Sequence, residues 1–269
     1  MRRLFFFMIV ALSGLVASPA QADPLAGMSK AQRAETLRFA VNNSLFTLYH
    51  EVGHLLIDKL KLPLLGREED AADNIATWIL LQKGTPEANQ ALEDAAKGWK
   101  MSGELYGDRY DDADFAAGYT PDRHRSMQIV CLMVGADGSA FRPVANSFSM
   151  QAERQRSCHF DYEVVDRSIS ALLDGQGPGT KVVVDYQASG GRLRQAERVL
   201  RQSGIFDAVA DEVRRGYRME GRVKFTAQRC GEPNAFYDTE TTEVIFCYEL
   251  VQDFLDMYAA EIGGPGRRY

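Results

Sequence analysis

Two histidines and a glutamate in the segment HEVGH have the types and the spacing to bind a metal ion and activate water. His50 and His54 are four residues apart, so on a helix both imidazoles lie on one face and can reach the same ion. Glu51 lies beside that face, where its carboxylate could accept the proton of an attacking water molecule. The segment therefore predicts a Zn²⁺-dependent hydrolase with His50 and His54 as ligands and Glu51 as the general base.

A zinc hydrolase uses three protein ligands and leaves a fourth position for water, so another ligand must come from elsewhere in the chain. Glu69 follows His54 by fifteen residues, and Asp73 follows Glu69 by one helical turn. We expect Glu69 to complete the ligand set and Asp73 to accept the second N–H of a ligand imidazole. Glu68 or a more distant carboxylate is the alternative ligand, because acidic residues are also favoured in the first turn of any helix.

Hydrolysis of an amide also needs a group that stabilises the negative charge of the tetrahedral intermediate. His124 is the leading candidate because it stands at the start of a predicted helix. Three tyrosines are alternatives: Tyr106, Tyr119 and Tyr237. His159 lies beside a cysteine, and we expect it to be structural.

The elements that must position these residues are mainly helical in the first part of the chain. Apolar residues recur at steps of three and four from Lys30 to about Leu60, which predicts a buried helix around HEVGH, ended by Pro63 and Gly66. Residues 107–122 are acidic and irregular, and we expect a loop there. Further helices are expected at 68–82, 86–106, 121–134 and 150–173, with a Gly/Pro/Asn-containing connection before the last.

The segment GQGPG (175–179) is the best candidate for a boundary between two regions. After it we expect a strand at 181–186, a helical stretch to about Arg215, and a final short helix at 251–262. Residues 222–230 and 241–250 are expected to be strands that form a hairpin around the turn-rich NAFYDTE segment. The predicted fold class is α+β, mainly helical with a small antiparallel hairpin or sheet in the C-terminal part. The predicted regions are 1–22, 23–174, 175–262 and a flexible tail, 263–269.

The first 22 residues have the pattern of a signal peptide. Two arginines precede a short apolar run, and the segment ends in Ala20-Gln21-Ala22, the small-x-small pattern that signal peptidase cleaves after. The mature chain would begin at Asp23, with no integral membrane anchor, in the periplasm or the medium. The chain is acidic, with a formal charge of −6, which argues against nucleic acid as a partner.

Four cysteines are present, which is an even number in a chain expected to be exported, where disulfides persist. None of them belongs to a C-x-x-C pair, so a zinc site of four thiolates is not expected. Sequence alone permits three pairings. We favour Cys131 with Cys158 and Cys230 with Cys247, because each pair falls within one local unit.

H-E-x-x-H followed by E-x-x-A-D resembles the glutamate-zincin, or thermolysin-like, peptidases. The whole mature chain resembles more closely a bacterial family known as putative metallopeptidases, long carried as a domain of unknown function. The shared pieces are 48–73, the segment around His124, Gln128 and Cys131, and 230–250; residues 120–135 depart from the family's more aromatic-rich form. The resemblance implies a zincin-like helical core and a peptide or protein substrate.

In thermolysin-like peptidases an N-A-F-x-D-type strand precedes the zinc helix and pairs with the extended substrate. Asn234, Phe236 and Tyr237 belong to a similar segment, Asn234–Asp238, but here it follows the zinc helix by most of the chain. One hypothesis is a permuted order, in which strand 241–247 or its hairpin partner folds back beside the 30–60 helix. The other is a plain hairpin closed by a disulfide.

Three functions from different classes fit the sequence. The first is an active zinc endopeptidase or related amide hydrolase. The second is a zinc-binding envelope protein without catalytic activity, which acts through contacts. The third is a structural exported domain without a metal. The completeness of the ligand set favours the first.

Overall fold

The computed structural model describes residues 23–106 and 120–263. The predicted signal peptide, nearly all of the predicted acidic loop, Tyr119 and most of the predicted tail lie outside these ranges. The side chain of Tyr106 also lies outside the described part.

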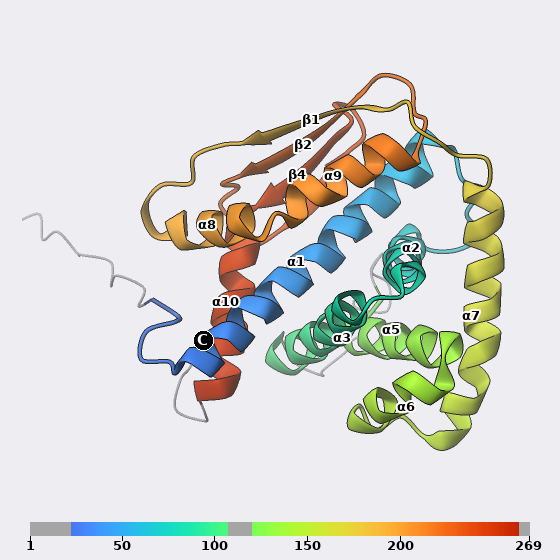
Figure 1. Ribbon diagram of the computed structural model, residues 1–269, viewed down its shortest axis with the longest axis horizontal. Coiled ribbons are helices and arrows are strands. Elements are labelled where there is room, and N and C mark those ends of the chain that lie inside the picture. Colours follow the sequence, from blue (N-terminus) through green and yellow to red (C-terminus); the bar gives the residue numbers. More distant parts are fainter. Residues whose placement is uncertain (1–22, 107–119, 264–269) are drawn as a thin grey trace, which may run out of the picture.

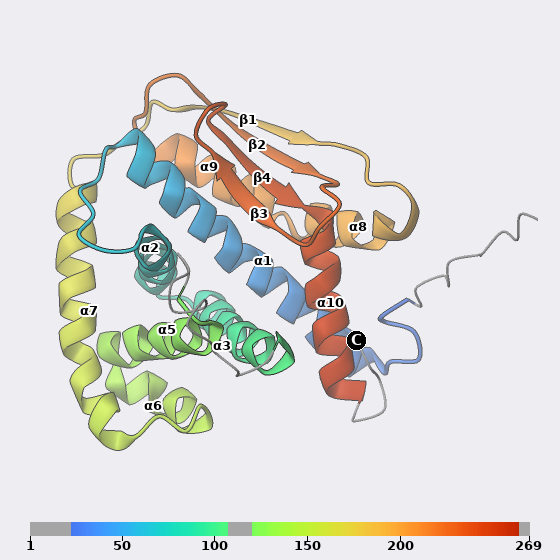
Figure 2. The same ribbon diagram turned by 180° about the vertical axis from the view of Figure 1, so that it is seen from behind.

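A long helix, α1 (Lys30–Lys59), is the central element. Its N-terminus is closed by a capping box in which Ser29 and Gln32 exchange side-chain and backbone hydrogen bonds. Figures 1 and 2 show α1 running through the middle of the molecule, with the sheet, α8 and α9 on one side and α2, α3, α5, α6 and α7 on the other. HEVGH lies in the C-terminal half of α1, where most side chains are buried.

The helices on one side of α1 follow it in the sequence. α1 packs against α2 and α3, α3 packs against α5, and α5 packs against α7. Their bounds are α2 (Glu68–Lys83), α3 (Pro86–Tyr106), α5 (Asp122–Ala136), α6 (Gly138–Ser147) and α7 (Ala152–Leu173). The predicted helices at 68–82, 86–106, 121–134 and 150–173 are all observed, with small shifts at their ends.

The sheet lies on the other side of α1 and has the strand order β1-β2-β4-β3. β1 pairs with β2 and β2 with β4 in parallel, whereas β3 is antiparallel to β4 and forms an edge of the sheet. Parallel neighbours need a long crossover, which α8 and α9 provide between β1 and β2. The elements are β1 (Lys181–Tyr186), α8 (Arg194–Ser203), α9 (Ile205–Gly216), β2 (Arg222–Gln228), β3 (Ala235–Asp238), β4 (Glu243–Cys247) and α10 (Tyr248–Gly263), with a 3₁₀ turn (Gly191–Leu193) before α8.

The predicted fold class, α+β with a small sheet in the C-terminal part, is confirmed, but one predicted pairing is wrong. Segments 222–230 and 241–250 do not form a hairpin with each other, because β2 and β4 are parallel. The hairpin partner of β4 is β3, which arises from the NAFYD segment. The segment predicted as a turn-rich connection is therefore itself a strand, and it occupies the edge.

Two helical details also differ from the sequence prediction. The Gly/Pro/Asn-containing connection contains α6, and the side chain of Asp137 accepts hydrogen bonds from the backbone N–H groups of Ser139 and Ala140 in its first turn. The helical stretch before Arg215 is interrupted at Gly204, which has a φ of 69° and ends α8 in the left-handed conformation.

Both favoured disulfides are present. Cys131–Cys158 joins α5 to α7, and Cys230–Cys247 joins the segment before β3 to the end of β4. The larger of two hydrophobic clusters among the described residues includes residues of the helices and of the sheet.

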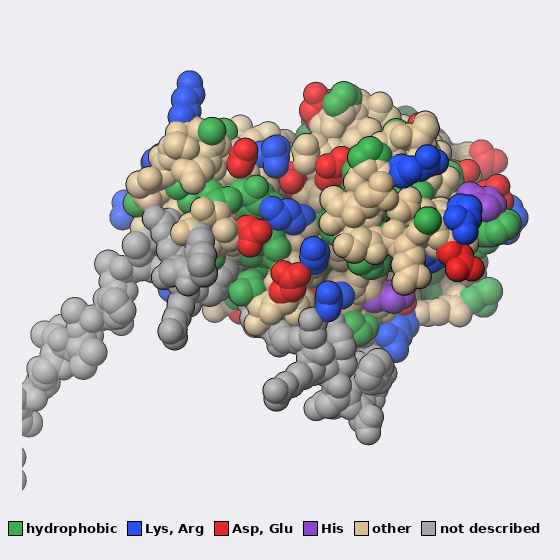
Figure 3. Space-filling view, turned by 90° about the horizontal axis from the view of Figure 1, so that it is seen from below, with side chains coloured by type: hydrophobic (Ala, Val, Ile, Leu, Met, Phe, Trp, Pro, Cys, Tyr) green, Lys and Arg blue, Asp and Glu red, His purple; other side chains and the backbone are tan. Residues whose placement is uncertain are grey.

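Within the described ranges, no helix combines the length and the apolar character that a membrane span requires. Figure 3 shows one face of the molecule, on which acidic and basic side chains are interspersed.

Candidate metal centre

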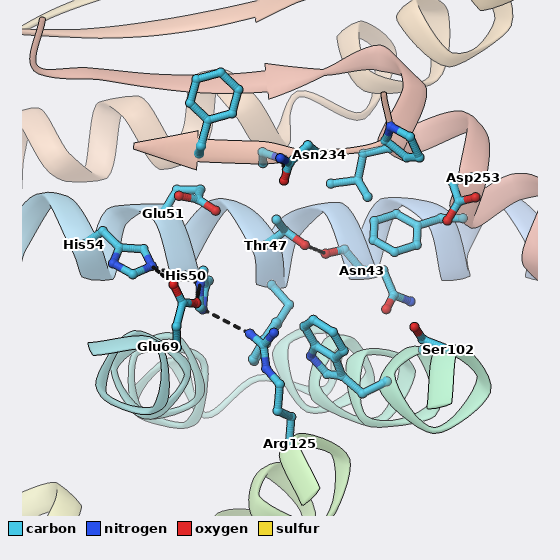
Figure 4. Close-up of a pocket in the computed structure, with 18 of the residues that line it drawn as sticks. Asn43, Thr47, His50, Glu51, His54, Glu69, Ser102, Arg125, Asn234 and Asp253 are labelled. Atoms are coloured by element: carbon cyan, nitrogen blue, oxygen red, sulfur yellow. Dashed lines mark hydrogen bonds and ion pairs between the residues drawn. The ribbon is translucent and has the colours of Figure 1, made fainter. Parts of the chain in front are cut away.

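His50 and His54 bring two ring nitrogens together on one face of α1. Their Nε2 atoms are 3.1 Å apart, as expected for imidazoles one helical turn from each other. Figure 4 shows both rings directed toward α2, where Glu69 approaches them. The distances from Glu69 Oε2 to His50 Nε2 and from Glu69 Oε1 to His54 Nε2 are 3.2 and 3.7 Å. One ligand atom from each of the three residues lies within 4.8 Å of the other two.

A close crossing of α1 and α2 makes this approach possible. Gly53 lies against Ala72, and a Cβ at position 53 would be only 2.9 Å from the Ala72 Cα. Glu69 and Asp73 flank Ala72 on α2, so the absence of a side chain at Gly53 brings both carboxylates to the histidines.

The outer nitrogens of both imidazoles are held by carboxylates. His50 Nδ1 is 2.8 Å from Asp73 Oδ1, and His54 Nδ1 is 2.9 Å from Glu68 Oε1. Because a carboxylate accepts, each Nδ1 donates, and each Nε2 is directed toward Glu69. The structure thus brings together His50, His54, Glu69 and Asp73 as the sequence predicted, with Glu68 against the outer side of His54.

The charges of these groups favour a cation at the centre. Hydrogen bonds to His50 and His54 lower the pKa of Glu69 well below its ordinary value. Burial would raise the pKa of Asp73, but its hydrogen bond to His50 and the charge of Arg125 lower it. Burial opposes protonation of His50, yet hydrogen bonds to Asp73 and Glu69 raise its pKa to about 9. Both carboxylates are therefore anionic at neutral pH.

Glu51 is buried, and its side chain lines the same cleft as the two histidines. Burial raises the pKa of its carboxyl, partly offset by the charges of His50 and His54 and by a hydrogen bond from the backbone N–H of Tyr237. The Glu51 carboxylate thus lies between α1, which carries it next to His50, and β3, whose backbone contacts it (Figure 4).

The cleft has a volume of about 730 Å³ and follows α1 from His54 toward Asn43. Residues of α3 and α5 line one side, and residues of β3 and α10 line the other (Figure 4). Its apolar lining includes Phe46, Trp99, Leu250 and Phe254. An elongated groove of this kind fits an extended ligand rather than a small compact one.

β3 forms one wall of the cleft, through Ala235, Phe236 and Tyr237, with Asn234 just before it. The Asn234 carbonyl accepts a hydrogen bond from the Cys247 N–H. Because hydrogen-bonded and non-hydrogen-bonded residues alternate along an antiparallel strand, the backbone N–H and C=O groups of Ala235 and Tyr237 face the free edge. The preceding loop is fixed by Cys230–Cys247 and by the buried Glu249 carboxylate, which accepts from the N–H groups of Cys230 and Gly231. β3 packs against α1, the helix that carries HEVGH, which is the placement that the permuted-order hypothesis requires, and it is at the same time part of a hairpin closed by a disulfide.

A family model described as a putative metallopeptidase matches residues 20–173 and 186–263. The chain belongs to this metallopeptidase family. Comparisons with curated proteins and with solved structures gave no match. The family implies a metal ion, and His50, His54 and Glu69 form a group that could hold one.

The structure does not bring His124 to the metallopeptidase cleft. Its side chain is exposed and lines a separate, smaller cavity with Met127, Gln128 and residues near the start of α7. Successive helix residues are about 100° apart around the axis, so when Arg125 faces the cleft His124 faces away. His124, predicted to stabilise the negative charge of the intermediate, therefore does not line the cleft that contains His50, His54 and Glu69.

Of the three tyrosines named as alternatives, only the side chain of Tyr237 lies in the described part of the chain, and His159 was expected to be structural. The Tyr237 hydroxyl donates to Asp58 Oδ2 at 2.8 Å, on the side of α1 beyond His54. The side chain of His159 is exposed, and its Nδ1 lies 2.8 Å from the Arg156 carbonyl.

Arg125 and Trp99 line the cleft, and neither was predicted from the sequence. A signal was present in the helical period, because Arg125 precedes the buried Ile129 by four residues and the buried Leu132 by seven. His124 instead precedes Gln128, which is only partly buried. His124 also precedes a buried residue, Cys131, by seven, so the period of α5 favours Arg125 but does not by itself decide between the two.

A second group of possible ligands, Cys131, Cys158 and Asp161, is not a comparable site. The two sulfur atoms are bonded to each other, so neither is a thiolate that could bind a metal.

Proposed function

We propose that this chain is an exported zinc-dependent peptidase that cleaves peptide bonds with Glu51 as the general base. The observation that carries the proposal is the convergence of three ligand atoms, from His50, His54 and Glu69, beside the buried carboxylate of Glu51 in one elongated cleft.

The donor set fits zinc. Two imidazole nitrogens and one carboxylate oxygen are a ligand set of catalytic zinc sites, which keep a further position open. Asp73 and Glu68 orient the two imidazoles from behind, as carboxylates do at such sites. A bound Zn²⁺ supplies a Lewis acid that polarises the scissile carbonyl and lowers the pKa of water.

Glu51 performs the proton transfers in this mechanism. Its carboxylate accepts the proton of the attacking water and returns it to the nitrogen of the leaving amine. Burial, which raises its pKa, makes it a stronger base than an exposed glutamate, and the Tyr237 N–H keeps it in place.

β3 orients the substrate. Its free edge faces the cleft, and an extended peptide there would pair with the backbone at Ala235 between the side chains of Asn234 and Phe236. A main-chain contact of this kind selects an extended peptide, while the apolar lining toward Asn43 contacts its side chains.

Export is supported by the signal-like pattern of the first 22 residues and by two disulfides, which persist in oxidising compartments. The alternative, a zinc-binding envelope protein without activity, has less support because a long open cleft adjoins the ligand set.

The test compares Glu51→Gln with the parent and with Glu153→Gln, a control on the exposed first turn of α7. Zinc content is measured after purification without chelator, and cleavage is measured on casein and on a peptide library. We expect Glu51→Gln to keep zinc and to lose hydrolysis by about 100-fold or more, and His50→Ala to lose zinc. Cleavage by Glu51→Gln at the parent rate would refute the mechanism.

A further inference from the structure

Arg125 connects α5 to the metal centre through Asp73. Its Nε lies 2.6 Å from Asp73 Oδ2 and its Nη2 lies 2.7 Å from Asp73 Oδ1, which is a two-point pair. Asp73 Oδ1 is also the atom that accepts from His50 Nδ1, at 2.8 Å. The side chains of Arg125, Asp73 and His50 are each about one-tenth exposed or less.

Trp99 of α3 fixes the other face of this arrangement. The central guanidinium carbon of Arg125 lies 3.6 Å from the centroid of the Trp99 ring, a stacked cation–π contact. Stacking on Trp99 of α3 therefore fixes the plane of the guanidinium, and the pair with Asp73 of α2 fixes the direction of its N–H groups.

The direct contact between Arg125 and His50 is long (Figure 4). Arg125 Nη2 is 3.5 Å from His50 Nδ1, and both groups are donors when Nδ1–H is directed to Asp73. The Asp73 carboxylate lies between the Arg125 guanidinium and the His50 imidazole, so the position of Arg125 determines the orientation of His50.

We propose that Arg125 is a positioning residue for the metal: by gripping both oxygens of Asp73, it fixes the carboxylate that turns His50 Nε2 toward the ion. This role rests on the proposed metal site, but it does not depend on which bond the protein cleaves.

The geometry explains why Asp73 needs this partner. Among the described residues, Arg125 contacts both carboxylate oxygens of Asp73, while His50 contacts one. Without Arg125 the carboxylate would be buried near the negative charge of Glu69 with a single partner. It could then rotate away from His50, and the imidazole would lose the contact that sets its orientation.

The test is zinc affinity, measured by competition with a chromophoric chelator, for the parent and for Arg125→Met. We expect affinity to fall about 10- to 100-fold, the range typical of losing an outer partner of a metal ligand. The absorption spectrum of the Co²⁺-substituted protein should change as well, because the ligand geometry changes. Arg154→Met is the matched control, since Arg154 forms an exposed ion pair with Asp161 on α7, and it should bind zinc like the parent.

A double-mutant comparison separates this role from others. Asp73→Asn already interrupts the connection, so adding Arg125→Met to it should weaken zinc binding less than about twofold further. Losses that multiply would overturn the proposal, because Arg125 would then act independently of Asp73. Arg125→Lys keeps the charge without the two-point grip, and it should fall between the parent and Arg125→Met.

The zinc measurement does not depend on hydrolysis. Parent-like zinc affinity in both Arg125→Met and Arg125→Lys would overturn the positioning role even if the parent is an active peptidase. A parent that binds zinc but cleaves nothing would overturn the peptidase proposal, and the zinc affinities of the Arg125 variants would still decide the positioning role. A parent that binds no zinc would overturn both.

Discussion

The crossing of α1 and α2 at Gly53 gives a prediction whose size follows from the structure. In Gly53→Ala the new Cβ would be 2.9 Å from the Ala72 Cα and 3.2 Å from both the Ala72 Cβ and carbonyl oxygen. Two of these three atoms are backbone, so a rotamer change cannot relieve the contact. Ordinary contact begins at 3.4 Å, so the helices must separate by about 0.5 Å at this point.

That displacement is small for the fold but large for the metal centre. The His50–Asp73 hydrogen bond would lengthen from 2.8 Å toward the limit of a useful bond. Overpacking costs about 1–3 kcal/mol, of which the better helix propensity of alanine offsets up to about 1 kcal/mol. We therefore expect a small fall in the melting temperature and a fall in zinc affinity of about 10-fold or more.

Thermal unfolding in EDTA measures the first effect, and chelator competition measures the second. Gly138→Ala is the control, because a Cβ at the start of α6 meets nothing within 4 Å. Should Gly53→Ala bind zinc and melt like the parent, the argument that this glycine sets the distance between α1 and α2 would be refuted.

Two further predictions concern the metal and the edge strand. EDTA should lower the melting temperature of the parent, and zinc at a free concentration of 100 times Kd should restore it by adding about 2.7 kcal/mol of stability. His50→Ala should melt at the same temperature with and without EDTA. A parent whose melting temperature does not change in EDTA would contradict the proposed metal site. Replacing Cys230 and Cys247 together by alanine should lower the free energy of unfolding by about 2–4 kcal/mol. It should also raise KM, because the loop before β3 is freed, while zinc affinity should stay the same. A fall in zinc affinity with an unchanged KM would count against the role of β3.

The grouping of His50, His54 and Glu69 was predictable because its geometry is mostly local. Two residues four apart on a helix share a face whatever surrounds them, and apolar residues recur at steps of three and four along α1. Glu69 and Asp73 were identified from the same spacing on α2. What sequence could not supply is the distance between the two helices, which depends on Gly53 meeting Ala72.

The misplaced residues depended on long-range contacts. Whether His124 or Arg125 faces the cleft is a matter of about 100° of rotation of α5, fixed by its packing against α3 and α7. The parallel pairing of β2 with β4 arises because the four-residue β3 takes the outer position, and no local pattern distinguishes that order from a simple hairpin. α6 was missed because it is short and contains Pro143.

The separation in sequence between α1 and β3 determines when the cleft becomes complete during synthesis. His50, His54 and Glu69 have all been made by residue 73, but β3 begins only at Ala235. At elongation rates of 5–20 residues per second, that delay is on the order of 10–30 s. Under the proposed function, an emerging or truncated chain carries the metal ligands without the wall that holds Glu51 and aligns a peptide, so proteolytic capacity is tied to completion of the polypeptide.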